Sequence, residues 1–150
     1  MPSYYSTRTA YNSFLVNTVP VSDDYTVSIT QTGTMFLIDA STVGGGSLDI
    51  SLPSPSHAGM YFKFVFTTQS ARIVNIQLQD DTASFVGLVI KHVNSGDPDV
   101  DATGLSANFD RMEFNTGQRP GSWIEIVSTG TQGVAHGHHF GAAHAWRNDT

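Results

Sequence analysis

Two alternating runs in the middle of the chain constrain its fold more than any other feature. Within 60–66 every second residue is Met or Phe, and within 74–78 every second residue is Val, Ile or Leu. A period of two over this length is typical of a β-strand with one face in a core. The polar segment 67–70 predicts a turn, so we expect the two runs to pair as antiparallel strands. The side chains expected inside are those of Phe62, Phe64 and Phe66.

The rest of the chain repeats this pattern in shorter pieces. Alternating or apolar segments recur at roughly ten-residue spacing, separated by turns rich in Gly, Pro, Asp and Ser, and none has the period of an amphipathic helix. This pattern is typical of a sandwich or a barrel. The expected fold is therefore all-β, a single antiparallel β-sandwich of the jelly-roll type. The other predicted strands are 24–30, 34–40, 48–52, 85–93, 112–114 and 122–128.

The composition divides the chain into a central domain and two unusual ends. We predict a sandwich domain over 23–131, an N-terminal docking arm over 1–22 and a Gly/His-rich C-terminal segment over 132–150. Either end can pack on its own domain or cover a neighbouring subunit, because both carry aromatic residues without a clear period. The candidate interface residues are Tyr4, Tyr5, Tyr11, Phe14, Phe140 and Trp146.

Charge and cysteine content narrow the function classes. Charged residues make up 13% of the chain, about half the usual share. The net charge is −6 and the seven basic residues are scattered singly, which disfavours nucleic-acid binding. The absence of cysteine excludes disulfides and thiol catalysis. No apolar run reaches membrane-spanning length and the N-terminus lacks the pattern of a signal peptide, so we expect the protein to stay in the cytosol where it is made or to leave it inside a larger assembly.

The order of short motifs resembles a known group of proteins. Gly-Thr-Met-Phe-Leu-Ile-Asp (33–39) is followed by Leu-Asp-Ile-Ser-Leu-Pro (48–53), Ala-Gly-Met-Tyr-Phe-Lys-Phe (58–64), Val-Asn-Ile-Gln-Leu (74–78) and Gly-Ser-Trp-Ile-Glu-Ile-Val-Ser-Thr-Gly-Thr (121–131). This order is similar to small β-sandwich modules of viral and bacteriophage structural proteins, namely fibre and spike heads and capsid-decorating proteins. The resemblance covers about residues 24 to 131. It implies a homotrimer without catalytic activity.

Four of the six histidines lie between 136 and 144. On a strand, His136 and His138 would point to one side, and near a trimer axis they would offer six imidazoles to a transition metal. The alternative is a solvated or packed tail without metal. Because neutral imidazoles become charged below about pH 6.5, we expect the contact made by 134–146 to weaken on mild acidification.

Two other motifs do not predict a binding site, and an enzyme site would need a further metal ligand. The glycine run 44–46 is not followed by the Lys and Ser/Thr of a phosphate-binding loop. The alternating acids of 97–101 lack the terminal Glu of a calcium loop. A cupin-like metal enzyme would need a carboxylate beside the histidines, and Glu113 and Glu125 are the candidates.

These observations favour one functional hypothesis over two others. The first is a non-enzymatic virion structural protein that binds copies of itself and other virion proteins such as the major capsid protein. The second is a receptor- or glycan-binding head that uses exposed Tyr and Trp side chains as stacking platforms. The third is the small metal-dependent, cupin-like enzyme.

Overall fold

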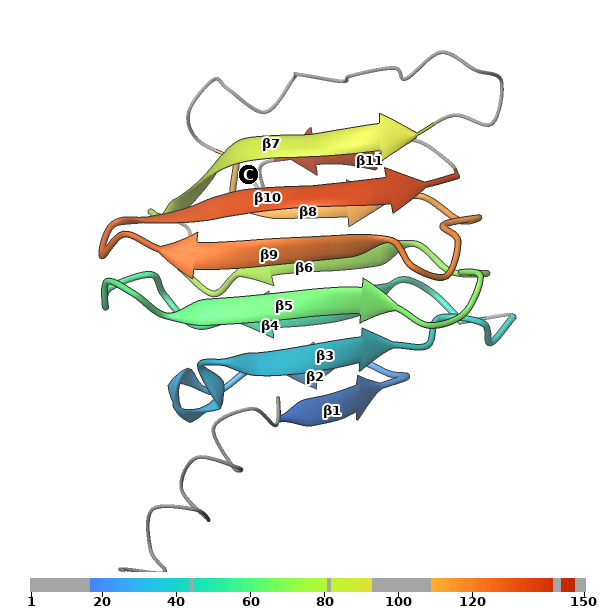
Figure 1. Ribbon diagram of the computed structural model, residues 1–150, viewed down its shortest axis with the longest axis horizontal. Coiled ribbons are helices and arrows are strands. Elements are labelled where there is room, and N and C mark those ends of the chain that lie inside the picture. Colours follow the sequence, from blue (N-terminus) through green and yellow to red (C-terminus); the bar gives the residue numbers. More distant parts are fainter. Residues whose placement is uncertain (1–16, 44, 81, 93–108, 142–143, 148–150) are drawn as a thin grey trace, which may run out of the picture.

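The protein is all-β and consists of two stacked sheets, as Figure 1 shows for the computed structural model. The structure describes residues 17–43, 45–80, 82–92, 109–141 and 144–147. One sheet has six strands in the order β1-β3-β5-β9-β10-β7, and the other has five in the order β11-β8-β6-β4-β2. Within this described part, no helix has the length and apolar character that a membrane crossing requires.

The strands are short and follow each other closely along the chain. Their bounds are β1 (Thr18–Val21), β2 (Tyr25–Thr26), β3 (Thr34–Ile38), β4 (Leu48–Leu52), β5 (Tyr61–Phe66), β6 (Val74–Leu78), β7 (Ser84–His92), β8 (Arg111–Phe114), β9 (Trp123–Ser128), β10 (Gln132–Phe140) and β11 (His144–Arg147). A 3-10 turn, η1 (Ile29–Gln31), lies between β2 and β3.

Successive strands alternate between the two sheets from β1 to β9. Strands two apart in the sequence therefore pair in parallel, β1 with β3 and β3 with β5 in one sheet, and β2 with β4 and β4 with β6 in the other. The crossovers are right-handed, as expected for parallel strands (Figure 1). The expectation of a purely antiparallel sandwich is wrong, because β7 and β10 are also parallel and only the pairs made by β8 and β9 are antiparallel among the described strands.

The prediction of a central hairpin is confirmed for the buried face of its first strand and wrong for the pairing of its two strands. Phe62, Phe64 and Phe66 are buried with at most 3% of their surface exposed, as the alternation predicts. Their strand β5, however, pairs with β3 and β9, and β6 lies in the opposite sheet. The alternation of residues predicts which face of a strand is buried. It does not predict which strand lies beside it.

The core lies between the sheets and is filled by side chains that stack in register. Phe36 of β3 is opposite Phe64 of β5, and their rings stack at 5.1 Å. Phe66 reaches across the core to Phe114 of β8, with ring centroids 5.8 Å apart. Such offset and tilted pairs contribute beyond the burial of their area. One continuous core therefore joins both sheets.

The predicted strand 24–30 ends early for a local reason. Only Tyr25 and Thr26 form a strand, and the chain then enters the 3-10 turn. Ser28 caps that turn, because its hydroxyl accepts from the amide of Thr30 while its own amide donates to the side chain of Gln31 at 2.8 Å. This reciprocal capping box satisfies donors that a continuing strand would leave unpaired.

The predicted boundary at residue 131 does not divide the structure. Residues 132–140 form β10, which pairs with β9 and β7 inside the six-stranded sheet. Its inward positions carry the small residues Gly133, Ala135 and Gly137, followed by His139. An ideal Cβ on Gly137 would lie 2.4 Å from the carbonyl oxygen of Trp123, so the strand needs a glycine there. The glycine-rich composition reflects close packing.

The N-terminal segment also contributes to the sheet. Residues 18–21, part of the predicted docking arm, form the edge strand β1 beside β3. The aromatic residues Tyr4, Tyr5, Tyr11 and Phe14 lie outside the described residues, and so do the alternating acids of 97–101.

Replacing one core ring tests the position of the core. We expect Phe64→Ala to reduce the free energy of unfolding by about 3–5 kcal/mol, because it leaves a cavity among rings that cannot close over it. Val65→Ala is the matched control, since the neighbouring side chain points to the outer face and is half-buried. Urea denaturation measures both, and a similar loss in the two variants would contradict the assignment of faces.

A glycine substitution tests the packing of β10. We expect Gly137→Ala to destabilise the fold by about 1–3 kcal/mol, because the added methyl group meets the backbone of β9. Gly46→Ala is the control, since an ideal Cβ there has no heavy atom within 4 Å. If thermal unfolding shifts equally for both variants, β10 does not pack as described.

Candidate functional site

The outer faces of the two sheets differ in chemistry. On the five-stranded sheet the outward side chains of the central strands are polar, and they bind one another across the strands. Asn75 donates to Asp49 at 2.7 Å, and Gln77 donates to the hydroxyl of Ser51 at 3.3 Å. Such a face is suited to water, as expected for one side of a sandwich. The outward residues are Asp49, Ser51, Asn75, Gln77, Arg111 and Glu113.

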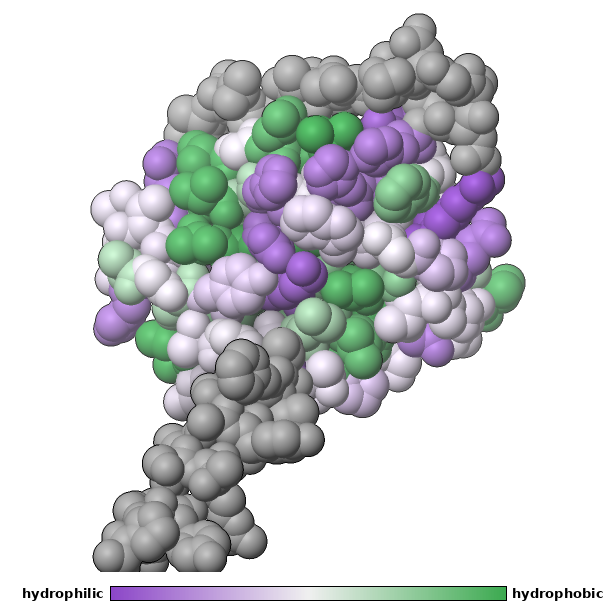
Figure 2. All heavy atoms as spheres, viewed as in Figure 1, coloured by the Kyte–Doolittle hydropathy of each residue, from purple (hydrophilic) through white to green (hydrophobic). Residues whose placement is uncertain are grey.

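The outer face of the six-stranded sheet is largely apolar. We call it the apolar face, and it faces the reader in Figure 2, where apolar side chains surround a central polar band. Val127, Val134 and Phe140 are 42%, 37% and 38% exposed, and the others are half-buried. A large apolar patch marks a contact surface. Its apolar members are Met35, Leu37, Val65, Val86, Leu88, Ile90, Trp123, Val127, Val134 and Phe140.

The polar band at the centre of this face begins with an ion pair. The ammonium group of Lys63 on β5 lies 2.8 Å from the carboxylate of Glu125 on β9, directly opposite in the register. The same ammonium lies 4.8 Å from the ring centre of Trp123, within range of a cation–π contact. Tyr61 donates a hydrogen bond to Glu125 from the other side. The two charges therefore neutralise each other.

These contacts shift the pKa values of Glu125 and Tyr61. The hydrogen bond from Lys63, helped by that from Tyr61, holds the pKa of Glu125 below its usual value. Burial, together with the neighbouring carboxylate, raises the pKa of Tyr61 to about 12. At neutral pH the band therefore contains a charged carboxylate, a charged ammonium and a neutral phenol.

Histidines from β10 and β7 continue the band. His136 and His138 both point outward, as predicted for alternate residues of a strand, and their ring centroids lie 5.8 Å apart. Each also contacts Trp123, at 5.4 and 5.3 Å between centroids. His138 bonds to His92 of β7, with 2.7 Å between Nδ1 and Nε2. Burial, followed by the neighbouring histidine charges, lowers the pKa of His138.

The remaining residues predicted for the C-terminal cluster have different positions. His139 is fully buried between the sheets, where its Nδ1 lies 2.9 Å from the amide oxygen of Gln118. Phe140 lies on the apolar face with its ring 4.9 Å from that of His92. His144 and Trp146 lie in β11, where Trp146 is opposite Met112 in the register; the description does not extend to their side chains.

The geometry gives the cupin-like hypothesis no support. The carboxylate of Glu125 is bound by Lys63, and that of Glu113 by Arg147 at 2.8 Å in the other sheet. Within the described ranges no three side chains of His, Asp or Glu converge as a metal-binding group. The predicted pair His136 and His138 therefore lacks a third protein ligand in this part of one chain.

A polar hollow of about 310 Å³ lies at one end of the sandwich, between the loop 54–56, the start of β7 and the β9–β10 turn. Asp80 is its acidic residue, and its carboxylate accepts from Thr82 at 2.6 Å and from Ser54 at 3.0 Å. Those hydrogen bonds lower the pKa of Asp80. Because the carboxylate already has these donors, we interpret it as a turn-forming group.

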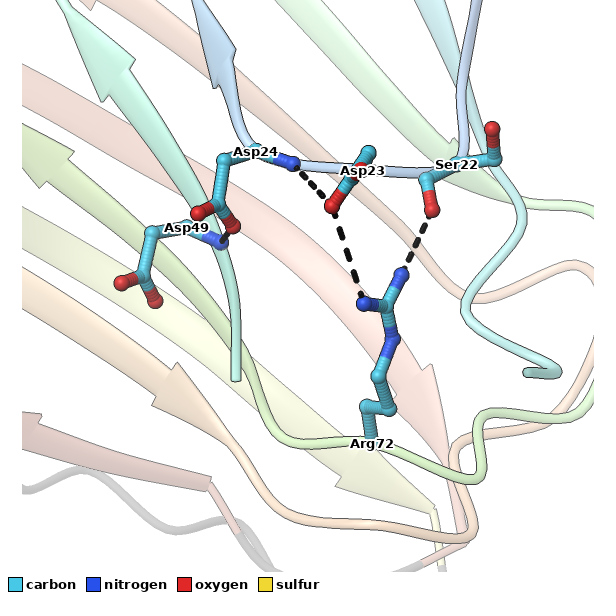
Figure 3. Close-up of polar contacts among 5 residues, drawn as sticks. All are labelled: Ser22, Asp23, Asp24, Asp49 and Arg72. Carbon is cyan, nitrogen blue, oxygen red and sulfur yellow. Dashed lines mark hydrogen bonds and ion pairs between the residues drawn. The ribbon is translucent and has the colours of Figure 1, made fainter. Parts of the chain in front are cut away.

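The buried side chain of Arg72, near the bend between β1 and β2, has a structural role (Figure 3). The guanidinium of Arg72 donates to the carbonyl oxygen of Ser22 at 2.6 Å and lies 3.9 Å from the carboxylate of Asp23. An ideal Cβ on Gly45 would lie 3.1 Å from Arg72, so the glycine run leaves room for this side chain. The arginine ties the loop before β6 to the start of the chain's first crossover.

Comparison of the chain with protein-family models, with curated proteins and with solved structures found no match. The interpretation of the site therefore depends on its own geometry.

Three histidines of the polar band lie together, namely His92, His136 and His138. The sequence analysis identified His136 and His138 and missed His92. His92 lies 46 residues before His138, at the end of the apolar run of β7, and no spacing rule connects them. Their contact exists because β7 and β10 are parallel neighbours. The available signal was that β7 is apolar on both faces and ends in a histidine.

The pKa of Glu125 provides a test of the polar band. We expect Lys63→Met to raise this pKa more than Tyr61→Phe does, because the lysine hydrogen bond is the larger cause of the shift. Carboxyl titration by NMR measures both. The stabilisation from the charged form is complete above the usual carboxyl pKa and is lost as the pH falls through the lowered pKa. Equal pKa values in the parent and Lys63→Met would contradict the ion pair.

Proposed function

We propose that this protein is a non-enzymatic structural component of a virus particle. It acts through the apolar face, which binds copies of the same chain in a homotrimer and other particle proteins such as a major capsid protein.

One observation carries the proposal, namely the contrast between the two outer faces. The five-stranded sheet presents a polar face, whereas the six-stranded sheet presents Val, Leu, Ile, Phe and Trp side chains on β7, β9 and β10. On β10 the larger side chains point outward and the small ones inward, the reverse of an ordinary surface strand. Interface cores are enriched in aromatic residues and depleted in unpaired charge, and this face has both properties.

The charges on the apolar face do not oppose contact with a second copy of the chain. The chain carries a net charge of −6, so two copies repel each other in general. On the apolar face the outward charges of β5 and β9 are Lys63 and Glu125, which form an ion pair with each other. Two copies can therefore approach through this face without bringing unpaired acids together.

The test is a charge placed in the apolar face. We expect the parent chain to form a trimer in sedimentation velocity experiments and Val134→Glu to shift it to the monomer, because the buried carboxylate would have no partner. Val134 is 37% exposed, so the substitution leaves the core intact. Gln77→Glu on the polar face of the five-stranded sheet is the matched control and should remain trimeric.

A parent chain that stays monomeric at every concentration contradicts the homotrimer. The particle role is tested separately by probing purified virions with an antibody against this chain. Virions without the chain would contradict it.

A glycan-binding head is the second candidate, favoured by the half-exposed Tyr61 and Trp123 beside the Lys63–Glu125 pair. Rings with adjacent polar groups suit the apolar and hydroxyl faces of a sugar. A hit on a glycan array that Trp123→Ala abolishes and Val134→Glu retains would favour this candidate over the particle contact.

A further inference from the structure

Two histidine nitrogens on neighbouring strands face each other on the apolar face. His92 Nε2 and His138 Nδ1 are 2.7 Å apart. The ring centroids are 5.0 Å apart and the ring planes differ by 21°. Because the nitrogens are so much closer than the centroids, they lie between the ring centres and the rings meet edge to edge. One of the two nitrogens therefore donates its N–H to the lone pair of the other.

The surroundings keep this pair partly dry and within reach of solvent. Both rings are half-buried. Phe140 lies against His92, and Trp123 lies against His138. Histidine binds metals through the lone pair of an unprotonated ring nitrogen, and the two facing nitrogens belong to different rings. Lys63 and Glu125, the charged residues of the polar band, form an ion pair with each other.

We propose that His92 Nε2 and His138 Nδ1 together bind one divalent first-row transition metal ion, such as Zn²⁺ or Cu²⁺. Neutral imidazole is a ligand that both ions prefer. The donor ring moves its proton to its other nitrogen through solvent, so both facing nitrogens present lone pairs and no net proton is lost. Water completes the coordination, since no third protein ligand converges here among the described residues.

Binding requires both rings to turn. Two zinc–nitrogen bonds of about 2.0–2.1 Å at a tetrahedral angle hold the nitrogens about 3.3 Å apart. The present separation is 2.7 Å and the two nitrogens point at each other, so each side chain must rotate until both lone pairs point at a shared position beside the present line of contact. This site differs from the predicted pair His136 and His138, because its ligands come from two strands of one chain and need no trimer axis.

Calorimetric titration of the full chain with Zn²⁺ at neutral pH tests the proposal. We expect the parent to take up one ion per chain, and His92→Asn and His138→Asn each to lose this saturable uptake. His57→Asn is the control, since His57 lies in a loop bonded to Ser56 and should leave binding unchanged. Circular dichroism and the urea midpoint show that the variants are folded.

Cu²⁺ titration followed by tryptophan fluorescence locates the ion. Trp123 is 5.3 Å from His138 between ring centroids, so bound Cu²⁺ should quench it. Trp123→Phe should remove that quenching without removing calorimetric Cu²⁺ uptake, and His92→Asn should remove both. No uptake by the parent, or uptake that survives both His92→Asn and His138→Asn, overturns the proposal.

Discussion

The core of this protein lies between two sheets, and from β1 to β9 consecutive strands belong to opposite sheets. Strands two apart in the sequence therefore lie side by side, and the pairing of β3 with β5 stacks Phe36 on Phe64. The burial of these rings is the dominant favourable term, since apolar area removed from water scales with stabilisation. The buried side chains of both sheets join in one core, and their inward direction decides which residues of each strand point outward.

The register determines what the outer faces display. Once Phe64 and Ile124 point inward, Lys63 and Trp123 must point outward on adjacent strands. The same constraint places the small residues of β10 against β9 and its larger residues outside. The apolar face is thus a consequence of how the core is packed, and it leaves valine, leucine and aromatic side chains on the outside of the six-stranded sheet.

The polar band makes this face selective. An uncompensated charge in an apolar contact is costly, so Lys63 and Glu125 are tolerated because they pair at 2.8 Å and share Tyr61 and Trp123 as neighbours. The histidines extend it towards β7, where His138 contacts His92.

The sequence by itself determined the all-β class and the inward face of β5, because alternation with period two is a property of a single strand. It also placed His136 and His138 on one side of a strand. Tertiary structure alone decided the parallel pairing, the membership of β10 in the sheet and the meeting of His92 with His138. These depend on which strands lie side by side, and pairing over such separations is set by packing of the whole core, which no local pattern records.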